Sequence, residues 1–199
     1  MKNTILFPLM AILLSLPALS FAQDEYKRDQ TLTIQPVLLA VPIGIVMYET
    51  RVSEPLSVAM FGGYGMFTYE RDNEQVDATV YGAGFQVRNY FLDRSTAHGN
   101  EPHIGIQALW AHGEGSEEDG GVFGVFGDDV WGRGEQFTGG PFVGYKYTAP
   151  FGLTAEIQLG AMAGARYSYG GEGNTGSDDP AKWEFKWMPI GNVGLGWSF

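Results

Sequence analysis

The sequence predicts an all-β fold, a closed antiparallel transmembrane β-barrel of eight strands in an up-and-down meander. Three observations predict this fold. Apolar residues alternate with small or polar residues along most of the chain, an export signal precedes them, and the chain ends on an alternating stretch, "GNVGLGWSF". In addition, 29 glycines, 14% aromatic residues and no cysteine form an uncommon composition for a soluble exported domain.

Residues 1–22 have the features of a secretory signal peptide. Lys2 supplies the basic start, an apolar run covers 5–16, and Ser20-Phe21-Ala22 forms a small-x-small cleavage site. The apolar run is too short for a spanning helix, so we expect cleavage after Ala22, with a retained membrane anchor as the alternative. The β-barrel domain then covers residues 23–199.

The mature chain is strongly acidic. Cleavage removes Lys2 from the 12 basic residues, which leaves 11 against 23 acidic residues and a formal charge of −12. Proteins that bind nucleic acid need basic patches, so we expect no nucleic-acid partner. Because cysteine is absent, the chain cannot carry the lipid of a lipoprotein, which is attached to an N-terminal cysteine.

Strands are predicted wherever alternation is sustained. In 153–169, for example, every odd position is apolar, whereas the even positions are mostly small, polar or charged. The expected strands cover 31–40, 43–52, 56–69, 80–91, 103–112, 136–147, 153–169 and 183–199. A single strand over 31–52 would give seven, an odd number that bacterial single-chain barrels avoid. Aromatic residues occupy both parities of 56–69, so its two faces stay unassigned.

The connections between these strands sort by length. The turns near 53–55, 92–102 and 148–152 fall at one end, and the stretches 70–78, 113–135 and 170–182 fall at the other. Short turns at one rim and longer loops at the other are typical of an outer-membrane barrel. The acidic residues of the outer loops are Glu114, Glu117, Glu118, Asp119, Asp128, Asp129, Asp178 and Asp179.

Aromatic residues gather at both ends of the apolar face. A soluble lipocalin-like barrel also alternates, but its apolar face points inward and has no reason to be banded. Two aromatic girdles around an aliphatic band suit a bilayer, so we expect the apolar face to meet lipid. The aromatic residues are Tyr81, Trp110, Phe137, Tyr167, Tyr169, Trp183, Phe185 and Trp187 toward the loops, and Phe91, Tyr145, Tyr147, Trp197 and Phe199 toward the turns.

The opposite face is rich in glycine and carries few charges. A narrow lumen tolerates charges only when they pair, so we expect Glu49 and Glu156 to pair with Arg88, Arg166 or Lys146 inside the barrel. An open sheet with solvated charges is the alternative. The predicted interior charge network consists of Glu49, Arg88, Lys146, Glu156, Arg166, Glu184 and Lys186.

Three stretches resemble a known family: "IVMYETRV" in the region of 46–52, "FQVRNYF" at 85–91 and the terminal "VGLGWSF". They are similar to the small eight-stranded outer-membrane barrels of Gram-negative bacteria, of the OmpA transmembrane domain, OmpX and OmpW type, and the resemblance covers the mature chain. It implies an assembly signal at Val193, Leu195, Trp197 and Phe199. It also implies the cell outer membrane as location and a monomer as the form. The implied partners are outer-membrane lipid, lipopolysaccharide, periplasmic chaperones and the barrel assembly machinery.

The expected function is structural or surface-interacting, with acidic extracellular loops carried by the barrel. A narrow porin-like channel for small or apolar solutes, as in OmpW-like barrels, is the first alternative, although eight strands leave a lumen filled by side chains. A lipid A-modifying enzyme is the second, and it would need a serine with a histidine and an acid.

The histidines do not favour the enzyme. His98 and His103 fall at the turn end, and His112 shares the lipid-facing parity of Trp110 and is followed by glycine and Glu114 rather than serine. We therefore predict no catalytic residues and no cofactor. Clustered carboxylates can hold calcium, but the loops contain no calcium-binding motif, so we predict no defined metal site.

Overall fold

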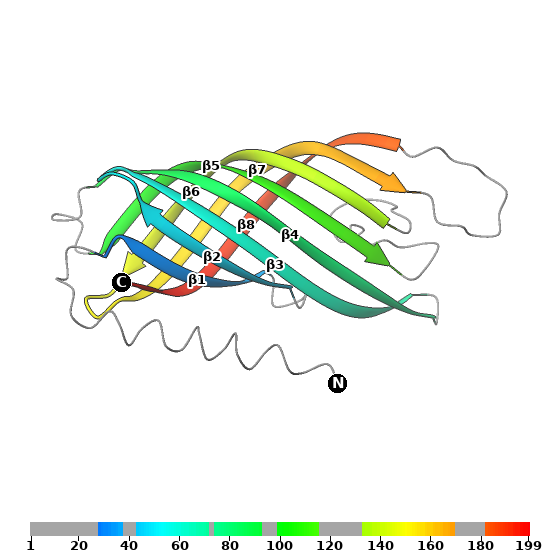
Figure 1. Ribbon diagram of the computed structural model, residues 1–199, viewed down its shortest axis with the longest axis horizontal. Coiled ribbons are helices and arrows are strands. Elements are labelled where there is room, and N and C mark those ends of the chain that lie inside the picture. Colours follow the sequence, from blue (N-terminus) through cyan, green and yellow to red (C-terminus); the bar gives the residue numbers. More distant parts are fainter. Residues whose placement is uncertain (1–27, 38–42, 72–73, 93–98, 116–132, 170–181) are drawn as a thin grey trace.

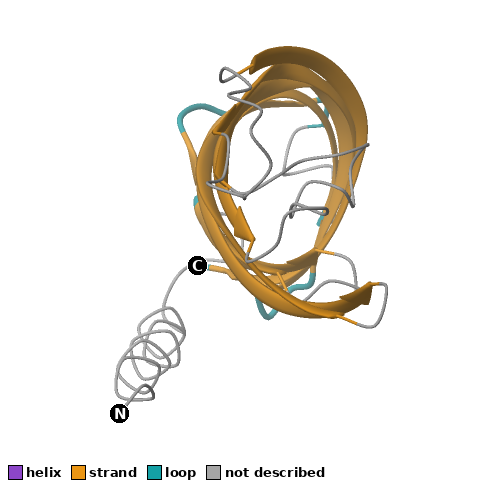
Figure 2. Cartoon of the chain, turned by 90° about the vertical axis from the view of Figure 1, so that its right-hand side faces the viewer, coloured by secondary structure: helices purple, strands orange, loops and turns teal. Residues whose placement is uncertain are grey.

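The computed structural model describes residues 28–37, 43–71, 74–92, 99–115, 133–169 and 182–199. Eight antiparallel strands follow one another around a closed barrel, and the last pairs with the first (Figures 1 and 2). This confirms the predicted eight-stranded meander, including separate strands on either side of 38–42. The strands are β1 (Gln30–Val37), β2 (Ile43–Arg51), β3 (Leu56–Arg71), β4 (Glu74–Tyr90), β5 (Asn100–Gly115), β6 (Arg133–Thr148), β7 (Leu153–Tyr169) and β8 (Lys182–Ser198).

The two ends of the barrel differ. At the turn end, short connections join β2 to β3 and β6 to β7, and both chain ends of the barrel lie there (Figure 1). At the loop end, 116–132 joins β5 to β6 and 170–181 joins β7 to β8. These two loops and the predicted signal peptide lie outside the described residues. No helix in the described part is long and apolar enough to cross a membrane, an observation that does not bear on strands.

The lumen is mainly polar. Among the described residues, 17 buried residues are polar or charged and only seven are hydrophobic. In a soluble barrel the buried set would be mostly apolar, because burial of apolar surface stabilises the fold. The predicted orientation, with the glycine-rich and charged parity inside, is therefore confirmed, and the lipocalin-like alternative does not fit.

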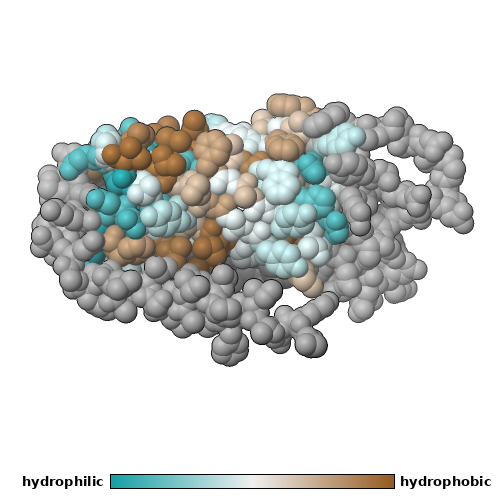
Figure 3. Space-filling model, in the orientation of Figure 1, coloured by the Kyte–Doolittle hydropathy of each residue, from teal (hydrophilic) through white to brown (hydrophobic). Residues whose placement is uncertain are grey.

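The exterior is a belt of apolar side chains. Ile106 and Leu159 near the middle of the wall are 60% and 59% exposed. The belt also fixes the faces of β3, which the sequence left open: Met60, Tyr64 and Met66 point outward, and Ser57 and Ala59 are buried in the lumen. In Figure 3, apolar residues cover much of the wall between hydrophilic residues at either side. A surface of this kind would be costly in water and is suited to lipid.

One predicted loop is wrong. The stretch 70–78 is almost entirely strand, because β3 extends to Arg71 and β4 begins at Glu74, where the two residues are register partners. Alternation in fact continues through Val76, Ala78 and Val80, and only Asp72 and Asn73, both turn-favouring residues, separate the strands. The charged residues in this stretch concealed the strand pattern.

The wall has unequal height. β1 and β2 have 8 and 9 residues, whereas the other six strands have 16 or 17. In Figure 1 the short pair stops midway along the barrel. β1 pairs with β8 only over Thr31–Ile34 and Leu195–Ser198, and the backbone of Phe199 adds two hydrogen bonds with Gln30, of 2.9 and 3.1 Å. The terminal alternating stretch is thus the closing strand of the sheet.

Candidate functional site

Six charged side chains fill the turn-end half of the lumen. They come from five strands, and period-two alternation directs each of them inward. We call this group the charge plug: Glu49 and Arg51 on β2, Arg88 on β4, Glu101 on β5, Lys146 on β6 and Glu156 on β7. The plug has three acids and three bases, so its formal charge is zero.

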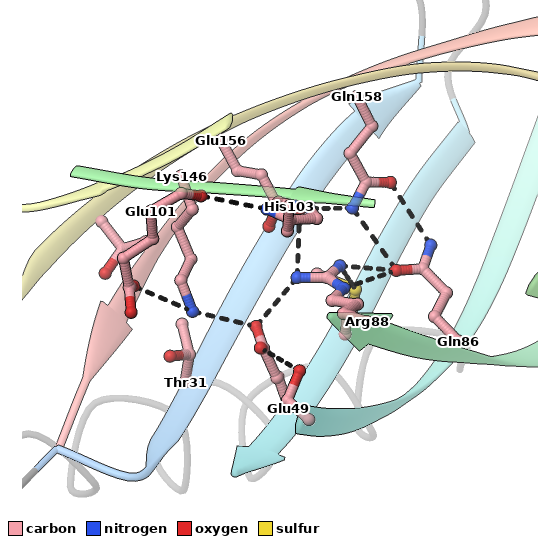
Figure 4. Close-up of polar contacts among 12 residues, drawn as sticks. Thr31, Glu49, Gln86, Arg88, Glu101, His103, Lys146, Glu156 and Gln158 are labelled. Atoms are coloured by element: carbon pink, nitrogen blue, oxygen red, sulfur yellow. Dashed lines mark hydrogen bonds and ion pairs between the residues drawn. The ribbon is translucent and has the colours of Figure 1, made fainter. Parts of the chain in front are cut away.

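The plug forms one continuous chain of alternating sign. Arg51 pairs with Glu101, whose other oxygen lies 3.4 Å from Lys146 Nζ. Lys146 Nζ lies 3.1 Å from Glu49 Oε2, and that oxygen lies 2.8 Å from Arg88 Nη1. The same Arg88 nitrogen lies 3.1 Å from Glu156 Oε1, which ends the chain (Figure 4). Each charge is therefore next to an opposite one, the condition under which burial of ions is tolerated.

Neutral groups complete the coordination of the central pair. Glu49 Oε1 accepts hydrogen bonds from Ser57 Oγ at 2.6 Å and from Tyr90 Oη at 2.5 Å. Arg88 Nε donates to Gln86 Oε1 at 2.9 Å. The guanidinium carbon of Arg51 lies 3.5 Å from the centroid of the Tyr90 ring, a cation–π contact. Because most donors and acceptors are satisfied, the plug holds its five strands in fixed positions.

His103 lies against the plug. Its Nδ1 donates to the Glu101 carbonyl at 3.1 Å, and its Nε2 lies 3.6 Å from Glu156 Oε1. Within the described residues, Nε2 has no hydrogen-bond partner. The ring fits because residue 144 is glycine: a Cβ there would lie 2.3 Å from Nε2. Gly144 thus provides the space that this histidine occupies.

Uncharged polar layers lie on either side of the plug. Toward the turn end, Ser198 Oγ is within 2.9 Å of Thr31 Oγ1 and 2.8 Å of Thr154 Oγ1. Toward the loop end, Gln86 Nε2 donates to Gln107 Oε1 at 2.9 Å, and Gln158 bonds to both Gln86 and Glu156 (Figure 4). Together, these layers and the plug bring side chains from seven strands into the lumen: β1, β2, β4, β5, β6, β7 and β8.

The structure brings together four members of the predicted interior network: Glu49, Arg88, Lys146 and Glu156. The other three lie nearer the loop end, where Arg166 and Glu184 are register partners and Lys186 is opposite Gly164. Their side chains are outside the described set. The predicted network does not include Glu101, because the expected strand begins at 103, and the sequence indicates no role for Tyr90, His103 and the glutamines of the lumen. Their shared inward parity was the available signal.

The remaining predicted residues lie elsewhere. His112 is on the outer face, as predicted, with Nε2 3.2 Å from Glu114 Oε1 and its ring beside Tyr81. Glu114 is the only predicted acidic loop residue that the structure describes, and within that part of the chain no group of histidine and acidic residues is arranged to hold a metal. Of the predicted assembly signal, Val193 and Leu195 point outward, and Trp197 lies beside Phe151.

Known proteins resemble this chain in structure but not in sequence. No protein-family model and no curated protein sequence matches the chain. Among solved structures, the N-terminal β-barrel domain of Pseudomonas aeruginosa OprF is 16% identical, with a TM-score of 0.41, 85% of this chain covered and 95% of that one. Neisserial surface protein A is also 16% identical (TM-score 0.46; coverage 85% and 93%).

A major outer membrane protein of Thermus thermophilus is 11% identical, with a TM-score of 0.47 and coverage of 85% and 98%. The chain is thus similar to small outer-membrane barrels.

Proposed function

We propose that this chain is an outer-membrane β-barrel protein with a structural or surface-interaction role and no enzymatic activity. One observation carries the proposal: the barrel is polar inside and apolar outside. The seam closes the sheet by pairing β1 with β8 over Thr31–Ile34 and Leu195–Ser198, and a structure that spans a bilayer satisfies its backbone groups by such pairing. The predicted signal peptide and terminal aromatic residue are consistent with export to that membrane.

The charge plug supports a barrel that does not conduct. A solute crossing the lumen would have to displace a buried chain of six paired charges and the amide and hydroxyl layers beside it. Separating such pairs is costly, because each ion would be left desolvated without its partner. The narrow channel, which the sequence left open as an alternative, therefore has less support than a barrel that does not conduct.

In this proposal, the acidic loops form the surface through which the barrel contacts molecules outside the cell. The outer-loop acids other than Glu114 lie in 116–132 and 170–181, outside the described residues. Their composition favours contact with lipopolysaccharide through bridging divalent cations, which prefer oxygen ligands. Barrel assembly machinery and periplasmic chaperones would be the partners during export, and we propose a monomer in the membrane.

Two measurements test the proposal. The expressed protein is expected in the outer-membrane fraction, with gel migration that shifts on boiling, because a folded barrel resists detergent until heated. Recovery in the soluble periplasmic fraction without a shift would contradict a membrane barrel. In planar bilayers the purified protein is expected to give no conductance steps, whereas stable steps would favour the channel.

A further inference from the structure

Two methionines lie side by side in the lumen, on the loop side of the charge plug. Met162 on β7 and Met188 on β8 are register partners, and both line the same cavity in the lumen. Residues directly opposite each other in an antiparallel pair have Cβ atoms about 4.5–5.5 Å apart. The methionine side chain has three rotatable bonds, so the two sulfur atoms can reach a common point between the strands.

Both sulfur atoms face the same part of β6. Thr138 Oγ1 lies 3.7 Å from Met162 Sδ, and Gln136 Nε2 lies 3.9 Å from Met188 Sδ. Gln136 and Thr138 are successive inward positions of one strand, so their side chains are neighbours on the lumen face. The two sulfurs are therefore directed toward one region of the lumen.

This region has space for an ion. The cavity that Gln136, Met162 and Met188 line has a volume of about 370 Å³. A thioether sulfur is a weak acceptor, so a hydrogen bond from an amide or a hydroxyl is easily exchanged for a stronger ligand. The Gln136 side chain also carries an amide oxygen, which can supply a third ligand beside the two sulfurs.

The other methionines of the mature chain do not form such a pair. Two of the seven methionines belong to the predicted signal peptide, and the remaining five all lie among the described residues. Met60 and Met66 are 64% and 61% exposed on the outer wall. Met47 Sδ lies 3.0 Å from Arg88 Nη2, whose positive charge opposes a bound cation.

Thioether sulfur is a soft ligand. It selects copper(I), whereas calcium, magnesium and manganese prefer carboxylate, carbonyl and water oxygens. The sequence contains no cysteine, so no thiolate of this chain competes for a soft ion. A pair of neutral sulfurs in an exported protein therefore favours a monovalent soft cation over the divalent ions that acidic side chains hold.

We propose that Met162 and Met188 together bind copper(I) in the lumen. The two sulfurs are the ligands, and the contacts with Gln136 and Thr138 hold them toward each other. The proposal goes beyond the structural role of the barrel and needs no passage through the charge plug. Metal binding and membrane location are therefore separate measurements, and either can fail without the other.

The test uses the mature chain in lipid nanodiscs with silver(I) in chloride-free buffer, because silver(I) is a soft monovalent ion that needs no reductant. One silver ion per barrel is expected above the binding of empty nanodiscs, and X-ray absorption should show two sulfur neighbours. Met162→Leu with Met188→Leu conserves volume, the kind of change that packed interiors tolerate best. We expect it to weaken binding by at least about tenfold, or about 1.4 kcal/mol.

Met60→Leu with Met66→Leu is the matched control, since it removes two sulfurs from the outer wall, and silver binding should not change. Folding of each variant is checked by heat-modifiable migration. If the double lumen variant does not fold, Met188→Leu alone should reduce the sulfur neighbours from two to one. Equal binding by the wild-type chain and a folded lumen variant would overturn the proposal, as would silver with nitrogen or oxygen neighbours and no sulfur.

Discussion

Arg88 Nη1 lies 2.8 Å from Glu49 Oε2, and neither side chain is more than 2% exposed. Lys146 Nζ contacts the same oxygen at 3.1 Å. Glu49→Gln would therefore remove the negative charge that Arg88 and Lys146 share, and both buried cations would lose a partner. We expect it to lower the free energy of unfolding by about 3–5 kcal/mol, the usual cost of breaking a buried ion pair. Urea titration of the folded barrel, followed by tryptophan fluorescence, measures the loss.

Glu54→Gln is the matched control for this change. Glu54 is exposed in the connection between β2 and β3, and its backbone carbonyl, not its carboxylate, accepts the hydrogen bond from Arg51. We expect a change within about 0.5 kcal/mol, as for most surface substitutions. Removal of the cation by Arg88→Met should also destabilise the barrel. An unchanged urea midpoint for Arg88→Met would disprove a stabilising role for the pair.

Gly144→Ala tests the fit of His103 in the lumen. The new methyl group would lie 2.3 Å from His103 Nε2, so the ring or the strand must move. We expect a loss of about 1–3 kcal/mol, typical of overpacking, in the same urea titration. Adding His103→Ala should recover part of that loss, because the clash is removed.

Gly62→Ala provides the comparison for Gly144→Ala, since its Cβ would meet only one backbone oxygen at the ordinary distance of 3.6 Å. The two glycines lie in strands of the same barrel, so intrinsic backbone effects are similar. Equal destabilisation by both substitutions would show that the contact with His103 is not the cause.

Ile106→Arg tests whether the apolar exterior faces lipid. Ile106 is 60% exposed near the middle of β5, and an arginine at the bilayer midplane costs about 2–4 kcal/mol. Val52→Arg, at an equally exposed position beside the turn, should cost no more than about 1 kcal/mol. The measurement is equilibrium unfolding in lipid vesicles. Equal costs at the two positions would mean that the wall is not embedded in a bilayer.

Cysteines at positions 31 and 198 test the seam between β1 and β8. Thr31 and Ser198 are register partners, and their side-chain oxygens lie 2.9 Å apart, close enough for a disulfide. The chain has no other cysteine, so oxidation of Thr31→Cys with Ser198→Cys should give one intramolecular bond, seen as faster migration of the boiled, unreduced protein. Gln35→Cys with Ser198→Cys, displaced along β1, should not form it.

Period-two alternation was sufficient to predict the number of strands, their order and the faces of the five strands from β4 to β8, because lipid on one side of the wall requires apolar residues at every second position. The faces of β3 could not be predicted, because its aromatic residues are divided between Phe61, on the lumen parity, and Tyr64, on the exterior. Strand ends were less predictable. β3 and β4 extend beyond the apolar belt through charged residues. Lipid does not contact the wall there, so the alternation of apolar and polar residues is no longer required.

The pairing inside the lumen could be predicted only in part. Inward parity identified Glu49, Arg88, Lys146 and Glu156, but the contacts among them depend on the stagger of strands that are far apart in the sequence. Arg51 pairing with Glu101, across the barrel from β2 to β5, is set by that stagger.

The seam of β1 and β8 has a kinetic consequence. It joins residues at the opposite ends of the barrel sequence over Thr31–Ile34 and Leu195–Ser198, whereas β7 and β8 pair from Leu153 to Ser168. Because β1 and β8 are far apart in the sequence, their pairing forms late in folding. Because it covers so few residues, it is also the first pairing to open. Amide hydrogen exchange should therefore be fastest in β1, and the lifetime of the closed state is set by a few residues at the two ends of the sheet rather than by the long strands between them.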